Sequence, residues 1–180
     1  MPASPWIDIE AASASLVHDL AAALLSRRLR LATAESCTGG LIAACCTALP
    51  GSSEWFDRGV VTYSNAAKSE LLGVPAALIE THGAVSSEVA CAMAQGLLGR
   101  CSADVVVAVT GIAGPGGGSL DKPVGTVWVA WGARWGSLQA VRLSLPGDRQ
   151  AVRHAAVIEA LGKVIGACAE WPIGAHGDGR

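Results

Sequence analysis

The octapeptide DVVVAVTG, residues 104–111, is the clearest indication of architecture in this chain. Five apolar residues follow one another without alternation, and the run ends in the turn residues Thr110 and Gly111. A continuous apolar run of this kind is typical of a strand that is covered on both faces. We therefore expect a central strand of a sheet with helices on both sides and a loop at its carboxyl end.

The segments around this run alternate between helical and strand patterns. Apolar spacing and capping residues predict six helices, over residues 7–28, 39–47, 65–73, 75–82, 86–97 and 148–168. Strand patterns cover residues 30–34, 58–64, 104–111, 126–131 and 139–145. The last two strands are joined by the short link GARWGS, which indicates an antiparallel hairpin. The order predicts an α/β fold, a mixed β-sheet with helices packed on it, in a single domain over residues 1–170, followed by a disordered tail, 171–180.

Composition restricts the partners of the chain. It has 180 residues, 51% of them apolar and 16% charged, so it can bury a core without disulfides or a metal. The net charge is −2 and the longest basic run is RRLR, residues 27–30, so neither nucleic acid nor a membrane is an expected partner. We find no secretory signal and no run of about 18 apolar residues. Most of the six cysteines are expected to be buried and reduced, which favours a cytoplasmic location.

Three polar segments follow predicted strands: ESCTGG (35–40), TYSNAAK (62–68) and TGIAGPGGGS (110–119). Ligands of open α/β sheets bind beyond the carboxyl ends of the strands, so these segments are the candidate site. No Walker loop is present, and the dinucleotide fingerprint fits poorly because Gly114-Pro115-Gly116 precedes a strand. The glycine-rich segment is either a flexible crossing or a backbone cradle for a phosphate or sugar.

The segment ESCTGG supports two interpretations. It is either an N-cap with a tight glycine turn or a nucleophile, Ser36, at a strand-to-helix turn. In the second case the backbone N–H groups of Thr38, Gly39 and Gly40 are candidates to stabilise an oxyanion. Cys37 is the rival nucleophile, since a helix N-terminus can stabilise a thiolate.

A serine nucleophile needs a base. His82 and His154 are candidates, but each is more typical of a surface or capping residue. Lys68 is the other candidate, because a desolvated lysine can be neutral enough to take the serine proton. Tyr63 could relay that proton to a leaving amine. The alternatives for Lys68 and Tyr63 are a solvated helix charge and a sheet aromatic.

Six motifs in order resemble the CinA C-terminal domain family, over about residues 10–165: TAESCTGGLIA, GVVTYSNAAKSELLGV, GAVSSEVA, AVTGIAGPGGG, KPVGTVWVA and GDR. The resemblance implies hydrolysis of nicotinamide mononucleotide to nicotinic acid mononucleotide and ammonia, in pyridine-nucleotide salvage. It implies a Ser–Lys–Tyr site at Ser36, Lys68 and Tyr63, with no metal or cofactor. Candidate contacts to the nucleotide are Thr110, Gly111, Gly114 and Arg149.

Two other functions stay open on this evidence. One is a catalytically silent nucleotide-binding module of the same fold, and the other is a different small-molecule amidase or esterase. The expected partner is a small-molecule nucleotide, and we expect a homo-oligomer. Trp55 and Trp135 are placed either at a subunit contact or in the core.

Overall fold

Five strands form one mixed sheet with the order β2-β1-β3-β4-β5 in the computed structural model, which describes residues 5–171. β1 pairs in parallel with both β2 and β3, whereas β4 is antiparallel to β3 and to β5. The strands are β1 (Leu31–Glu35), β2 (Phe56–Val61), β3 (Val105–Gly111), β4 (Thr126–Ala133) and β5 (Gln139–Ser144). The predicted α/β class and the antiparallel hairpin are confirmed, and the predicted tail lies outside the described residues except for Trp171.

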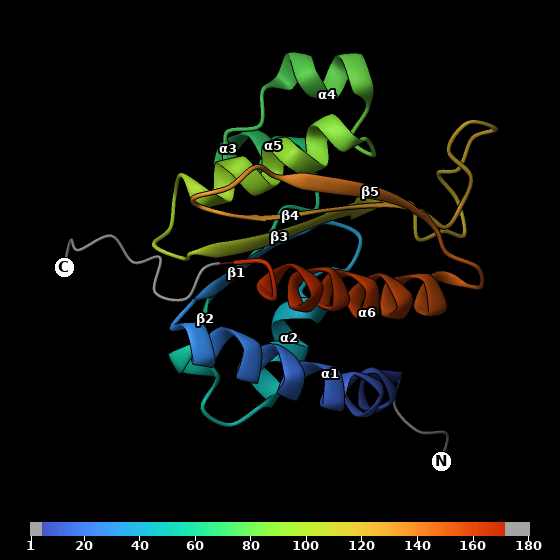
Figure 1. Ribbon diagram of the computed structural model, residues 1–180. Coiled ribbons are helices and arrows are strands. Elements are labelled where there is room, and N and C mark those ends of the chain that lie inside the picture. The colour runs from blue at the N-terminus through green and yellow to red at the C-terminus, as the bar shows by residue number, and fades with distance from the viewer. Residues whose placement is uncertain (1–4, 172–180) are drawn as a thin grey trace.

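Helices cover both faces of the sheet (Figure 1). One face carries α1 (Pro5–Arg27), α2 (Leu41–Ala48) and α6 (Arg149–Cys168). The other face carries α3 (Asn65–Leu72), α4 (Ala76–His82) and α5 (Ser87–Leu98). A short 3₁₀ helix, Ser52–Glu54, precedes β2. The chain is therefore a three-layer structure with the sheet in the middle.

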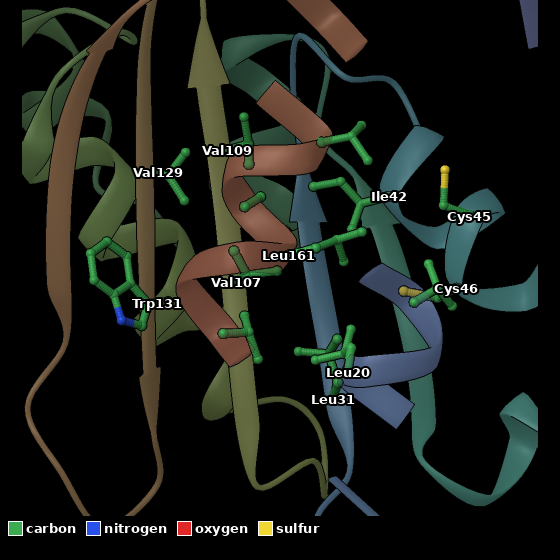
Figure 2. Packing of buried hydrophobic residues seen from close by; sticks show 14 of the residues in the cluster. Leu20, Leu31, Ile42, Cys45, Cys46, Val107, Val109, Val129, Trp131 and Leu161 are labelled. Carbon is green, nitrogen blue, oxygen red and sulfur yellow. The ribbon is translucent and has the colours of Figure 1, made fainter. Parts of the chain in front are cut away.

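The side chains of β3 explain its unbroken apolar run. Val105, Val107 and Val109 belong to the core cluster under α1, α2 and α6, whereas Val106 and Ala108 belong to the cluster under α5. All five are fully buried. Figure 2 shows the first cluster, in which Leu161 of α6 and Ile42 of α2 lie over β3 and β1. A strand with a core on each face requires apolar side chains at every position.

Element boundaries differ from the predictions by a few residues. The largest difference is at β2, which ends at Val61 instead of residue 64. The reason is that Ser64 accepts a hydrogen bond from the amide of Ala67 and so caps α3. All six cysteines, which lie within residues 5–171, are free, and four are buried, as predicted. Trp55 is buried in the core and is not available to a subunit contact.

One helix, α1, meets a length and composition criterion for a membrane span although it holds no unbroken run of 18 apolar residues. Its segment Ile9–Arg27 is long and apolar enough, with a mean hydropathy of 1.2, to meet the length and composition criterion for crossing a membrane. A core helix near the N-terminus meets the same criterion, so this is weak evidence for a span. Leu20 and Leu24 are fully buried against the rest of the protein. The apolar character of α1 therefore has an explanation in its packing on α2 and α6.

Candidate active site

The carboxyl ends of β1, β2 and β3 meet at one edge of the sheet because the three strands are parallel. Backbone hydrogen bonds extend the pairing past the strands: the amide of Ser36 donates to the carbonyl of Val109 (2.9 Å), and the amide of Thr62 donates to that of Glu35 (2.8 Å). Ser36 is thus fixed between its two neighbouring strands. The three predicted polar segments all begin at this edge.

Ser36 and Lys68 meet there. The Nζ of Lys68 lies 3.1 Å from the Oγ of Ser36, and it donates to the carbonyl oxygen of Thr62 at 2.9 Å. Lys68 is 1% exposed and Ser36 8% exposed. The pair is therefore almost completely withdrawn from solvent, and the alternative of a solvated helix charge does not hold for Lys68.

The sequence around Lys68 explains its inward direction. Ser64 starts α3 immediately after β2, and Lys68 lies one turn later. Lys68 and Leu72 are four residues apart, so they share the face of α3 that points into the protein, and both are buried. Burial lowers the pKa of the Lys68 ammonium from its usual value because desolvation disfavours the charged form. Within the described residues no carboxylate forms an ion pair with this amine. Such an amine is suited to accept a proton from Ser36.

Glu35, which sequence reasoning assigned no role, holds the turn behind Ser36. Its carboxylate is fully buried and accepts hydrogen bonds from the amides of Gly40 (2.9 Å), Ile42 (3.1 Å) and Ala43 (2.9 Å). The last residue of β1 therefore caps the first turn of α2. The sequence signal was an acid just before a glycine turn and a helix, but a capping side chain is ordinarily sought next to the helix and not at the end of a strand.

The structure changes the expected set of oxyanion donors, because two of the three predicted amides already have acceptors. The amide of Gly40 is occupied by Glu35, and that of Gly39 donates to the carbonyl of Ser36 (3.1 Å) in a tight turn. Gly39 and Gly40 have φ angles of 63° and 95°, which glycine adopts at no steric cost. In the described part of the chain, no group accepts a hydrogen bond from the amide of Thr38. Of the three predicted donors, Thr38 is the one whose amide has no acceptor, and the residue is fully buried.

Tyr63 and Arg149 form a second group at the same edge. Tyr63 is 60% exposed, and its hydroxyl accepts a hydrogen bond from Nη2 of Arg149 at 2.7 Å. Nη1 of Arg149 donates to the carbonyl of Gly114 at 2.9 Å. Arg149, at the start of α6, thus connects the tyrosine to the glycine-rich loop. Among the described residues no hydrogen bond joins Tyr63 to Ser36 or Lys68.

The other candidates are distributed less favourably for ligand contact. The hydroxyl of Thr110 is buried and donates to the carbonyl of Ala84 at 2.8 Å, so it ties β3 to the segment before α5. Gly111 lies opposite Val127, where a Cβ would come within 2.7 Å of a Val127 methyl group. The structure therefore gives Thr110 and Gly111 packing roles at the end of β3.

Cys37 is poorly placed to be a nucleophile. It is buried, and desolvation raises the pKa of its thiol to about 11, so the thiol is protonated near neutral pH. The negative charge of Glu35 acts in the same direction. Neither His82 nor His154 is hydrogen-bonded to Ser36 in residues 5–171, and His82 instead faces Glu88. No group of three or more His, Cys, Asp or Glu side chains in that range could hold a metal ion.

Fold and site together define an α/β protein with a buried serine–lysine pair at the carboxyl edge of a mixed sheet. The profile of the CinA C-terminal domain matches residues 13–168. The chain belongs to the CinA C-terminal domain family.

Named relatives agree with this assignment. The nicotinamide-nucleotide amidohydrolase PncC of Enterobacter agglomerans is 52% identical over 143 residues, covering 79% of this chain and 87% of that protein. A CinA-like protein of Akkermansia muciniphila is 48% identical over 90% of this chain, which spans only 39% of that longer protein. The crystal structure of the competence damage-inducible protein A of Klebsiella pneumoniae superposes with a TM-score of 0.85 at 41% identity, covering 88% of this chain and 98% of that one. A competence/damage inducible protein of Agrobacterium tumefaciens gives 0.80 at 46% identity, with 90% and 96% covered.

Proposed function

We propose that this protein is an amidohydrolase that deamidates nicotinamide mononucleotide to nicotinic acid mononucleotide and ammonia. The observation that carries the proposal is the distance of 3.1 Å between the buried Nζ of Lys68 and the Oγ of Ser36. A nucleophile and a base in hydrogen-bonding distance are the minimum required for covalent amide hydrolysis. The similarity to a protein named nicotinamide-nucleotide amidohydrolase supports the choice of substrate.

The proposed reaction has two halves. Neutral Lys68 takes the proton of the Ser36 hydroxyl as its oxygen attacks the carboxamide carbon, and the amide of Thr38 donates to the oxygen that gains negative charge. The C–N bond then breaks, and the nitrogen leaves as ammonia after receiving a proton by way of Lys68 or Tyr63. Water then cleaves the ester of Ser36. Lys68 takes a proton from this water and returns it to the Ser36 oxygen. Atoms balance to one water consumed and one ammonia released.

The nucleotide part of the substrate is assigned to the second group at the site. Arg149 lies between Tyr63 and Gly114 and carries the positive charge that a phosphate requires. We place the reaction in pyridine-nucleotide salvage, as the resemblance implies. We also expect a cytoplasmic homo-oligomer.

Release of ammonia from nicotinamide mononucleotide by the purified protein tests the proposal. We expect activity in the wild type and in Cys37→Ala, and loss of activity in Ser36→Ala and Lys68→Met with the fold intact by circular dichroism. Cys37→Ala is a matched control because it removes the nucleophilic atom next to Ser36. Binding of the nucleotide without ammonia release would instead identify a silent nucleotide-binding module. Equal rates on nicotinamide, its riboside and the mononucleotide would indicate an amidase that does not recognise phosphate.

A further inference from the structure

Arg153 lies beside the nucleophile turn and has no part in the mechanism above. It belongs to the second turn of α6, far from Ser36 in sequence. Its Nε donates to the carbonyl of Cys37 at 3.1 Å, and its Nη2 donates to the carbonyl of Thr38 at 2.8 Å. The planar guanidinium therefore holds two successive carbonyls of the turn with two different nitrogens, an arrangement that a lysine cannot reproduce.

These two contacts fix the direction of the intervening amides. In a trans peptide the C=O and N–H groups point in opposite directions. Because the carbonyl of Cys37 points to Arg153, the amide of Thr38, in the same peptide, points away from α6. The next peptide is fixed at both ends, since the carbonyl of Thr38 contacts Arg153 and the amide of Gly39 donates to the carbonyl of Ser36.

The hydrogen bonds of Glu35 make the direction of the Thr38 amide important, because they use the amides at the start of α2. The carboxylate of Glu35 accepts hydrogen bonds from the amides of Gly40, Ile42 and Ala43, so these amides are not free to stabilise an oxyanion. Among the described residues, the amides of Cys37 and Thr38 are then the ones in the turn without an acceptor from another residue, and the orientation of the Cys37–Thr38 peptide decides where the Thr38 amide points. Backbone donors aimed before the reaction starts are worth more than donors that must reorient.

We propose that Arg153 is a positioning residue that orients the Cys37–Thr38 peptide so that the Thr38 amide serves as the oxyanion donor. The proposal deepens the proposed function and rests on it for the identity of the substrate. Arg153 acts through the backbone and does not touch substrate. Its loss should therefore reduce kcat while KM stays nearly constant, because the amide is needed in the transition state more than in the ground state.

Arg134 provides a matched control. Its Nη2 also donates to two backbone carbonyls, those of Cys101 and Ala103, both at 2.8 Å. It follows β4 next to the amino end of β3, whereas Ser36 lies at the carboxyl ends of β1 and β3. Arg134→Gln thus removes a comparable arginine-to-carbonyl contact without disturbing the turn, and it reports how much of any effect comes from stability alone.

The experiment compares wild type, Arg153→Gln, Arg153→Lys and Arg134→Gln. We expect kcat for ammonia release to fall on the order of 10–100-fold in both Arg153 variants, with KM changed less than about threefold, because a misplaced donor costs about this much. Arg134→Gln should keep the wild-type kcat per folded molecule. Full activity of Arg153→Lys would show that charge alone suffices and would overturn the proposal. A raised KM with unchanged kcat would make Arg153 a substrate contact, and an equal loss in Arg134→Gln would make the effect one of stability; both overturn it.

A second readout separates this proposal from the proposed function. A fluorophosphonate reacts with an activated serine: the Ser36 oxygen forms a bond to phosphorus, fluoride leaves, and the serine proton goes to Lys68. Slower labelling of Ser36 in the Arg153 variants, but not in Arg134→Gln, supports positioning even if the wild type releases no ammonia from the nucleotide. Labelling rates that are equal in all four proteins, or no labelling of the wild type, would overturn it.

Discussion

The substitution Lys68→Met gives the sharpest test of the buried base. Methionine is unbranched and similar in length, so it can fill the same space without the charge. Burial lowers the pKa of Lys68 in the folded protein below the ordinary value of 10.5 that the unfolded chain approaches. Between those two pKa values the unfolded state binds more protons than the folded state, so the free energy of unfolding rises with pH in this window.

The size of the effect follows from one proton. Within the window, the unfolding free energy of the wild type should rise relative to that of Lys68→Met by up to about 1.4 kcal/mol per pH unit. Below the window the wild type bears the whole cost of burying the ammonium, and above 10.5 that cost is gone. The other titratable groups are common to both proteins and largely cancel in the difference. Ser36→Ala should keep the wild-type pH dependence, because it retains the amine.

Urea unfolding of the three proteins from pH 7 to 10.5 measures this difference, and ammonia release measures activity over the same range. In the wild type, kcat/KM should rise with pH through one ionisation whose midpoint lies below 10.5, because the neutral amine of Lys68 is the base. The same midpoint should mark the lower limit of the stability window, since both experiments report the free enzyme. Lys68→Met should lose on the order of 10²–10⁴ in kcat. Parallel stability curves for wild type and Lys68→Met would refute the buried neutral base.

Four further substitutions test the turn and the core. Glu35→Gln should leave at least one buried amide of α2 without an acceptor and lower the unfolding free energy by about 1.5–3 kcal/mol in urea titrations; no loss would contradict the capping role. Gly39→Ala should cost about 1–2 kcal/mol because its φ is positive, whereas Gly162→Ala, with open space at its Cβ inside α6, should gain roughly 0.5–1 kcal/mol. Leu161→Ala should cost about 2–5 kcal/mol, since the side chain is fully buried over β3; a smaller loss would mean that the core collapses around the cavity.

Much of the fold could be predicted because the relevant signals are local. The run from Val105 to Val109 required a strand buried on both faces, and the structure places alternate residues in two separate cores. Ser86 and Asp148, the first residues of the predicted helices 86–97 and 148–168, cap α5 and α6 by accepting hydrogen bonds from the amides of Val89 and Ala151. Boundaries were less well predicted, because the end of a strand depends on pairing with its neighbour and not on its own side chains.

The candidate site was predicted only in outline. The motifs ESCTGG and TYSNAAK identified Ser36 and Lys68 as possible partners, but spacing alone favoured a solvated lysine. Whether Lys68 is neutral depends on its burial, which arises from the packing of α3 beside α4 and α5 at the carboxyl ends of the strands. The expectation that Gly40 could stabilise an oxyanion was wrong, because the carboxylate of Glu35 takes up its amide.

The amino-acid pattern is sufficient to specify the helices, the strands and the residue types at the carboxyl edge, because periodicity and capping act over a few neighbouring positions. It is insufficient to say which hydroxyl meets which amine, or which amides of the turn stay available. Those features come from Lys68, which lies 32 residues along the chain from Ser36, and from Arg153, which lies 115 residues or more from the two turn carbonyls that it contacts. Their distances, and the desolvation that lowers the pKa of the lysine, exist only once separate elements have packed together.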